Sequence, residues 1–427
     1  MNMKKTILLT FIILIITLLV LADNPEALNF PNLVYGEEGE IFPGVTWQTA
    51  SSQEPRWELI IIRVDLSNRN ILLRPAHQER QRTFFRTSTI AARENAIAAV
   101  NGSFFGIWNP DNHPDHPMAP YFGQSTEYCR INGTTLAPNR RNSSRATFGL
   151  SHDRERHFSY IGPDQVFDNP DWNGVLHALA GNPKLVREGE VVSGLNNETR
   201  HPRTILGWNN SNKIITLVTI DGRQPEWSIG MTRHELALLL LDLGCENGIN
   251  YDGGGSTTAW IQGEVVNRYS DASERGTVTA WLVIPAYVID HTDEECTVQG
   301  NWFISDSHDY YNTNALLTMG GDPERMVTWR PDLAKAGSYK IYTWYVDGAA
   351  RTANAAYTIQ SASGENTVII DQRYGGGEWI SLGTYSFSAG TQGSVTLNNT
   401  ASEGELLSAD SVKFVYIGPD QNQLFLE

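Results

Sequence analysis

Residues 249–258 read Ile-Asn-Tyr-Asp-Gly-Gly-Gly-Ser-Thr-Thr, and their types and order are suited to chemistry. A short apolar strand would deliver one carboxylate, Asp252, into three glycines followed by three hydroxyl side chains. Consecutive glycines let the backbone adopt positive φ close to a ligand, and successive amides in such a turn form an anion-binding concavity. An acid beside an anion cradle indicates a polar or phosphorylated substrate. A plain glycine-rich hairpin turn is the alternative interpretation.

Further charged residues stand where strands are expected to end, namely Arg203, Asp221 and Arg223. The β-rich runs 203–208 and 213–220 surround turn-forming residues and predict a hairpin, and a second hairpin is expected over 248–266. Between them, Thr232 and Glu235 form a capping box that begins a helix with leucines at helical spacing. If the hairpins share a sheet around this helix, their charged groups converge on one cleft. For each of these residues alone, a structural ion pair is the alternative.

The elements that must position these groups belong to a chain of 427 residues, which is long enough for two domains. The formal net charge of -16 argues against nucleic acid as a partner, because phosphate backbones are held by clustered Lys and Arg. Local basic patches remain compatible with this overall acidity.

The expected domain organisation has five parts. A basic start followed by an apolar run predicts a signal peptide over residues 1–22 and an exported protein, with an uncleaved membrane anchor as the alternative. A lead-in over 23–44 precedes a catalytic domain over 45–286, a linker over 287–299 and a β-sandwich over 300–418. We expect the catalytic domain to be α+β, with β-hairpins packed around helices, and the second domain to be all-β.

A long loop rich in proline and histidine follows residue 106 and carries Asp111, His113, Asp115 and His116. Loops of this length inside a compact domain are usually functional or disordered. No cofactor is predicted, and an ordinary loop at the rim of the site is the favoured interpretation. A divalent metal held by this loop is kept as an alternative.

An ordered set of motifs resembles the phosphodiester glycosidase family over roughly residues 96–285. The motifs are Asn101-Gly-Ser-Phe-Phe-Gly, Pro202-Arg203-Thr204, Asp221-Gly-Arg223, Ser228-Ile-Gly-Met-Thr, Asp252-Gly-Gly-Gly-Ser-Thr-Thr, and Asn267 with Ser270-Asp271 and Glu274-Arg275. The resemblance implies an enzyme that cleaves a sugar from a phosphodiester. Such cleavage needs bidentate arginine to neutralise the phosphate and a carboxylate to act as nucleophile, base or oxocarbenium stabiliser.

The resemblance also implies roles for individual residues. Asp252, Asp221 and Arg203 are expected to be catalytic, and Glu235 is a rival to Asp221 whose capping role is favoured. Substrate contacts are expected from the following residues: Asn101, Arg223, Gly253, Gly254, Gly255, Ser256, Thr257, Asn267, Asp271 and Arg275. Within this set the arginines would bind phosphate, the glycine-rich loop would hold phosphate or sugar oxygens, and the asparagines would bind hydroxyls.

A second resemblance covers most of residues 300–415, where the motifs are similar to the golvesin C-terminal domain family. They include Gly300-Asn-Trp302, Trp329-Arg-Pro-Asp-Leu, Gly377-Glu-Trp379 and Ala409-Asp410-Ser-Val. This resemblance implies attachment to a polysaccharide or cell-envelope surface, because aromatic faces stack on sugar rings. For any single tryptophan here, a place in the core is the favoured interpretation.

The sequence therefore predicts an exported glycoside hydrolase that cleaves the anomeric C–O bond of sugar-1-phosphodiesters or related glycans. One alternative is an envelope protein that binds an anionic glycan without cleaving it. The other is a metal-dependent hydrolase that uses Asp111, His113 and His116.

Overall fold

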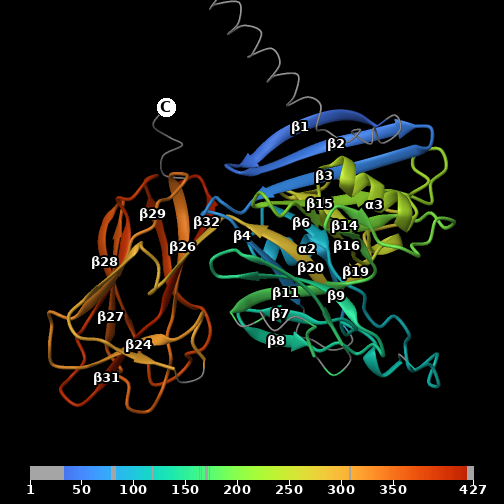
Figure 1. Ribbon diagram of the computed structural model, residues 1–427. Coiled ribbons are helices and arrows are strands. Elements are labelled where there is room, and N and C mark those ends of the chain that lie inside the picture. The colour runs from blue at the N-terminus through green and yellow to red at the C-terminus, as the bar shows by residue number, and fades with distance from the viewer. Residues whose placement is uncertain are drawn as a thin grey trace, which may run out of the picture.

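The computed structural model describes residues 33–77, 83–117, 119–162, 164, 166–168, 172, 174–306 and 309–420. Two bodies built from strands lie beside each other in Figure 1, the N-terminal one in blue to yellow and the C-terminal one in orange to red. The signal peptide expected over 1–22 lies outside the described residues. Neither of the two α-helices in the described part of the chain is long enough to cross a membrane.

The largest sheet of the N-terminal domain has eight strands in the order β1-β2-β3-β15-β14-β16-β12-β13. Their bounds are β1 Val34–Phe42, β2 Val45–Gln53, β3 Arg56–Asp65, β15 Ile214–Ile220, β14 Arg203–Trp208, β16 Asn247–Asn250, β12 Lys184–Arg187 and β13 Glu190–Val191. The hairpin predicted over 203–220 is confirmed, since β14 and β15 pair antiparallel from Arg203 opposite Ile220 to Trp208 opposite Ile215.

Three further sheets complete this domain, in the orders β10-β9-β11-β7-β8, β18-β17-β6-β20-β4 and β19-β5. The first contains β10 Arg156–Ile161, β9 Arg145–Ser151, β11 Val175–Gly181, β7 Cys129–Ile131 and β8 Thr134–Ala137. The second contains β18 Glu264–Val265, β17 Ala259–Ile261, β6 Ala98–Asn101, β20 Thr279–Ile284 and β4 Leu72–His77, and the third contains β19 Gly276–Thr277 and β5 Phe85–Arg86. The three larger sheets share one apolar core that includes Phe148, Leu206 and Trp281.

Helix α3, Arg233–Asp242, covers the opposite face of the eight-stranded sheet, where Leu236 and Leu240 pack against Ile205 and Val218. The predicted capping box is confirmed: Thr232 Oγ1 accepts a hydrogen bond from Glu235 N at 3.1 Å, and Glu235 Oε2 accepts one from Thr232 N at 2.8 Å. A second short helix, α2, spans Thr87–Arg93, and the 3₁₀ turns η1 and η2 span Ala119–Tyr121 and Gly254–Ser256.

The α+β class expected for the catalytic domain is wrong, because this domain is nearly all β. In its described residues only α2 and α3 are α-helices, and the hairpins form sheets that pack on one another rather than around helices. The reason is that β-branched and aromatic runs fill the segments between the helices, and such side chains fit a pleated, half-buried surface. The well-capped helix that begins at Arg233 is a local feature and does not set the class of the domain.

The hairpin expected over 248–266 is also wrong. Strand β16 pairs with β14 and β12 in the eight-stranded sheet, whereas β17 pairs with β6 and β18 in another sheet. The glycine-rich segment at 252–257 therefore carries the chain from one sheet to the next instead of folding it back. Asp252 consequently lies where the ends of two sheets meet.

The second domain contains sheets in the orders β21-β32-β26-β29, β22-β25-β30-β27-β28 and β23-β24-β31. Their bounds are β21 Ala286–Asp290, β32 Ser411–Gly418, β26 Gly337–Trp344, β29 Ile380–Phe387, β22 Cys296–Gln299, β25 Met326–Trp329, β30 Ser394–Asn398, β27 Ala355–Ser361, β28 Gly364–Ile370, β23 Phe303–Ser305, β24 Ala315–Met319 and β31 Leu406–Ala409. These sheets enclose a core that includes Trp329, Tyr357 and Phe414.

Two boundary segments differ from expectation. The segment predicted as an irregular lead-in contains β1, which pairs with β2 at the edge of the large sheet. The segment predicted as a linker, 287–299, contains most of β21 and all of β22, and β21 is buried against β32. Its polar residues had indicated a solvated connection, but Asp293 is held by Arg69 and His152, each at 2.8 Å. The chain thus passes between the domains at Pro285.

Candidate active site

The backbone around Asp252 is held by the end of β6 on one side and by β14 on the other. Asp252 N donates to Gly102 O at 3.1 Å, and Asn101 Nδ2 donates to Asp252 O at 2.8 Å. On the other side, Tyr251 N donates to Thr204 O at 2.8 Å. These bonds join β6, β14 and β16, so the Asp252 carboxyl is presented from a rigid junction rather than from a free loop.

The three glycines after Asp252 are required by close contacts. A Cβ on Gly253 would lie 2.5 Å from Pro202 O, and one on Gly255 would lie 2.0 Å from Asp271 Oδ2 and 2.3 Å from an Arg275 guanidinium nitrogen. Gly254 has φ +62°, and a Cβ there would lie 3.0 Å from Arg223. The glycines therefore allow Arg223 and Arg275 to lie directly on the loop beside Asp252.

The loop is a less open anion cradle than the sequence predicted. Gly254 N donates to Pro202 O at 2.9 Å, and the amides of Ser256 and Thr257 donate to Gly253 O and Gly254 O, each at 3.2 Å. These three amides are thus used inside the protein. The Thr257 hydroxyl is buried without a hydrogen-bond partner in the described residues, so it can still meet a ligand.

The positive charge of the site comes from arginine side chains. Arg203 is 9% exposed, its Nε donates to Met231 O at 3.1 Å, and a terminal nitrogen donates to Thr199 O at 3.2 Å. Burial, together with Arg233 and Arg223, lowers the pKa of Arg203 to about 10. Among the described residues, no carboxylate lies within 4.0 Å of Arg203, Arg223 or Arg233. These neighbouring arginines therefore carry positive charge that an anionic ligand can balance.

Arg233 and His201 belong to this cluster and were missed by sequence reasoning. Arg223 donates to His201 Nδ1 at 3.4 Å, and the pKa of His201 is lowered by partial burial and by Arg203, Arg223 and Arg233. The Nε of Arg233 is buried without a hydrogen-bond partner among the described residues. A signal was present in the sequence, since His201 is two residues from Arg203 and Arg233 directly follows the N-cap of α3.

Asp252 is a carboxyl group close to two arginines of the site, Arg275 and Arg223. Burial raises its pKa to about 6, although Ser256, the Gly253 amide, Arg275 and Arg223 all favour the ionised form. Desolvation outweighs the positive neighbours, so the group changes charge near neutral pH. A carboxyl group tuned in this way is suited to act as a base or nucleophile.

This pKa has a consequence for stability. Because the folded-state pKa lies above the ordinary value of 3.8, the folded protein keeps a proton on Asp252 that the unfolded chain has released. The resulting stabilisation is full below about pH 4 and is lost as pH rises through 6. We expect the free energy of unfolding of wild type to fall relative to that of Asp252→Asn across this range. Urea unfolding at several pH values measures the difference, and parallel curves would contradict the assignment.

Asp221, which the sequence predicts to be catalytic, is buried and hydrogen-bonded within the protein. It is 4% exposed and accepts hydrogen bonds from Trp227 Nε1 at 2.8 Å, Asn267 Nδ2 at 3.0 Å and Arg268 N at 3.0 Å. Burial raises its pKa, and these three donors oppose the shift. Its carboxyl group ties together the loops on which Arg223 and Asn267 stand.

We therefore expect Asp221→Ala to lower the free energy of unfolding. Removal of the carboxyl leaves the donors of Trp227, Asn267 and Arg268, which now lie in part-buried hydrogen bonds, without this acceptor. This change costs about 1–3 kcal/mol in the free energy of unfolding. Urea unfolding checks this value, with Glu264→Ala as the control because the Glu264 side chain is exposed. An Asp221→Ala protein as stable as this control would contradict a structural role.

The two asparagines predicted to bind hydroxyls are likewise used within the protein. Asn101 donates a hydrogen bond to Asp252 O, and it accepts hydrogen bonds from Thr204 Oγ1 at 2.6 Å and from Thr258 N at 3.1 Å. Asn267 accepts from Ala259 N at 2.7 Å and donates to Asp221 and to Thr257 O. Both residues thus position the glycine-rich loop.

Arg275 lies at the rim of the site, where it pairs with Asp271 at 2.6 Å. It also lines a neighbouring apolar pocket of about 360 Å³ with Phe84, Phe105, Ile107 and Phe122. The rings of Phe84 and Phe105 are 5.4 Å apart, and those of Phe84 and Phe122 are 5.3 Å apart. Apolar aromatic surface next to a cationic cluster fits a molecule with both a ring and an anionic group.

The proline- and histidine-rich loop does not assemble its candidate ligands. His113 and His116 instead pack on Trp108, with ring centroids 5.0 and 4.1 Å apart. Within the described part of the chain, one group of three carboxylate and imidazole ligands comes within 4.8 Å, namely Asp290, His291 and Asp410 in the second domain.

Comparison with protein families supports the division seen in the fold. Residues 94–284 match the model described as phosphodiester glycosidase, and residues 287–416 match the model described as golvesin C-terminal domain. Each model matches one of the two domains seen in the fold. The segment that matches the phosphodiester glycosidase model contains Asp252 and all four arginines of the site.

Similar proteins match only parts of the chain. A xanthan lyase of Bacillus sp. (strain GL1) is 37% identical over 140 residues, which is 32% of this chain and 15% of that protein. Golvesin of Dictyostelium discoideum is 31% identical over 130 residues, or 30% of this chain and 22% of that protein. The chain therefore spans less than a quarter of the length of these relatives.

Among solved structures, the catalytic domain of zebrafish N-acetylglucosamine-1-phosphodiester alpha-N-acetylglucosaminidase is 19% identical. The match covers 60% of this chain and 84% of that structure with a TM-score of 0.44.

Proposed function

We propose that the N-terminal domain is a hydrolase that cleaves the anomeric C–O bond of sugar-1-phosphodiesters. The observation that carries this proposal is one desolvated carboxyl group, Asp252, beside Arg223, which belongs to a cluster with Arg203 and Arg233 that has no carboxylate partner among the described residues. The match to the phosphodiester glycosidase model supports the same reaction class.

The site can meet the main chemical requirements of this reaction. When the bond between the anomeric carbon and oxygen breaks, the electron pair stays on the phosphate oxygen, and a water oxygen becomes bonded to the carbon. Phosphate is a good leaving group, so a second carboxyl group acting as general acid is not needed. The loss of Asp221 as a catalytic candidate is therefore compatible with the mechanism.

The residues of the site have distinct roles in this scheme. Arg203, Arg223 and Arg233 neutralise the phosphate, for which the planar guanidinium fork is suited. Asp252 stabilises positive charge at the anomeric carbon, as nucleophile or as the base that accepts a proton from water. The aromatic pocket beside Arg275 receives an apolar face of the substrate.

For the second domain we propose attachment to a polysaccharide or envelope surface, in an exported protein. Its tryptophans do not form an open platform: Trp329 and Trp344 are buried, and Lys413 Nζ lies 4.2 Å from the Trp379 ring centroid. Tyr374 is 70% exposed and is the aromatic side chain best placed for a sugar.

Product analysis tests the proposed reaction. The substrate is N-acetylglucosamine-1-phosphate linked through its phosphate to a second sugar. The proposal predicts free N-acetylglucosamine and a sugar phosphate. Tight binding without turnover would instead favour a glycan-binding protein, a function that the single free carboxyl group of the site also allows.

A further inference from the structure

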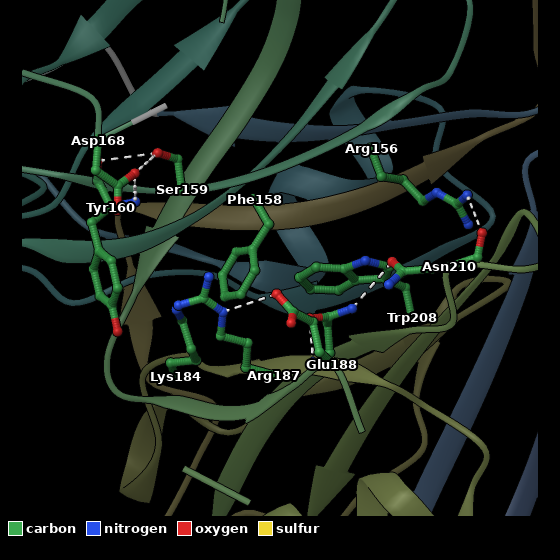
Figure 2. Close-up of a pocket in the computed structure, with 11 residues that line it drawn as sticks. Arg156, Phe158, Ser159, Tyr160, Asp168, Lys184, Arg187, Glu188, Trp208 and Asn210 are labelled. Carbon is green, nitrogen blue, oxygen red and sulfur yellow. Dashed lines mark hydrogen bonds and ion pairs between the residues drawn. The ribbon is translucent and has the colours of Figure 1, made fainter. Parts of the chain in front are cut away.

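A second pocket lies between β10 and the strands β12, β14 and β16, away from the site around Asp252 (Figure 2). It has a volume of about 400 Å³. Asn247 lines it at the start of β16, and Asp252 is five residues further on, about 16 Å along an extended chain. The lining residues are Arg156, Phe158, Ser159, Tyr160, Asp168, Lys184, Arg187, Glu188, Trp208, Asn210 and Asn247.

Lys184 is the unusual residue of this pocket. It is 7% exposed, and its Nζ lies 4.6 Å from the Phe158 ring centroid and 4.2 Å from that of Tyr160. Among the described residues, no carboxylate comes within 4.0 Å of this nitrogen. Charged lysine is rarely buried to this degree without a partner. Burial and Arg187 lower the pKa of Lys184, and the more distant carboxylates Asp168 and Glu188 oppose this shift only in part.

The carboxylates of the pocket are already engaged. Asp168 accepts hydrogen bonds from Tyr160 N at 2.8 Å and from the Ser159 hydroxyl, and Glu188 pairs with Arg187 at 3.1 Å. Three cations, Arg156, Lys184 and Arg187, face these two anions. Counted over its described lining residues, the pocket therefore has one net positive charge, although the chain as a whole has a formal charge of -16.

The other walls provide what a sugar needs. The rings of Tyr160, Phe158 and Trp208 follow one another along the pocket in Figure 2, and the Phe158 and Trp208 centroids are 4.9 Å apart. Asn247 Nδ2 donates to Asn210 Oδ1 at 3.1 Å, and Asn247 Oδ1 accepts from Glu188 N at 3.1 Å. The amide nitrogen of Asn210 keeps bonding capacity toward hydroxyls. Aromatic faces with amides at their edge are suited to a pyranose ring.

We propose that this pocket binds a saccharide unit that carries a carboxylate, such as a uronic acid. The carboxylate would pair with Lys184, the ring would lie along Phe158 and Tyr160, and the hydroxyls would meet Asn210 and Asn247. A single ammonium group matches a singly charged carboxylate, whereas phosphate is better served by forked guanidinium groups. The pocket would hold a glycan chain at a point separate from Asp252, whether or not that chain is cleaved.

Titration calorimetry of the full chain with methyl glucuronide tests this inference, with methyl glucoside and glucose 6-phosphate as comparison ligands. We expect methyl glucuronide to bind at least about tenfold more tightly than methyl glucoside, as befits a hydrogen bond to a charged group. Equal affinities would overturn the inference. Tighter binding of glucose 6-phosphate would overturn it in favour of a phosphate site.

Variants of the lining residues test whether methyl glucuronide binds in this pocket. Lys184→Met keeps the apolar stem and removes the charge, so methyl glucuronide should bind at least about tenfold more weakly, whereas Lys184→Arg should retain binding. Lys213→Met is the matched control, because Lys213 is paired with Glu155 at 3.4 Å on the surface. If Lys184→Met does not fold, Tyr160→Leu should weaken binding severalfold. Undiminished binding by either folded variant would contradict the inference. Asp252→Asn should bind like wild type, which separates this pocket from the proposed active site.

Discussion

Asp252→Asn should lower kcat on a sugar-1-phosphodiester by about 10²- to 10⁴-fold, the contribution typical of a positioned acid–base group. The asparagine side chain has the shape of the carboxyl group and can still accept a hydrogen bond from the backbone N–H of Gly253. It neither attacks the anomeric carbon nor accepts a proton. Initial rates under saturating substrate measure the loss.

The stability of this variant separates lost chemistry from lost folding. At pH 7 wild type holds a desolvated charge on Asp252, because the pKa of this group is raised only to about 6. The neutral amide avoids that cost, so the free energy of unfolding of Asp252→Asn should be no lower than that of wild type. A variant that is well folded and retains more than a tenth of the wild-type kcat would remove Asp252 from the mechanism.

Arg203→Met should lower kcat/KM by about 10- to 150-fold, which corresponds to the loss of about 1.5–3 kcal/mol in hydrogen bonds to a charged group. Arg203 is buried, and no carboxylate partner lies within 4.0 Å of it in the described residues, so its charge is available to a bound phosphate. The phosphomonoester product should inhibit the variant correspondingly less. Steady-state kinetics with and without product measures both effects.

The matched control for this variant is Arg56→Met. Arg56 pairs with Glu226 at 2.9 Å on the surface, so its charge is already balanced and solvated. This control should change kcat/KM by less than about twofold, in keeping with the small worth of exposed ion pairs. Equal losses in both variants would indicate a general electrostatic effect of net charge rather than a phosphate site.

The sequence predicted the groups that carry the proposed chemistry because they lie in short, recognisable segments. Asp252 follows an apolar strand directly, and Arg203 and Arg223 flank a hairpin whose strands and turn are evident from residue type. The structure brings these three residues together, with Arg275 at the rim.

The sequence could not distinguish a reactive polar group from a saturated one. Asn101, Asp221 and Asn267 have the residue types of a binding site, yet each is occupied by donors or acceptors from distant segments, such as Thr204 for Asn101. Whether a carboxyl group is already paired depends on long-range contacts, which residue spacing does not contain.

The prediction of the fold class was wrong for a related reason. Local propensity correctly predicted α3 and the β14–β15 hairpin, but it cannot show that β16 and β17 join different sheets across the glycine-rich loop. That crossing places Asp252 at the junction of two sheets. The sequence did not predict the pocket around Lys184 either, because its rings and cations come from three strands that are separated in sequence.

The most direct test of the central claim is to determine which bond is broken. Hydrolysis of the phosphodiester in oxygen-18-labelled water, followed by phosphorus NMR of the released phosphomonoester, reports where the water oxygen goes. The proposed mechanism predicts an unlabelled phosphomonoester, because water adds to the anomeric carbon and the bridging oxygen leaves with phosphorus. Label in the phosphomonoester would show attack at phosphorus and would contradict a glycosidase mechanism.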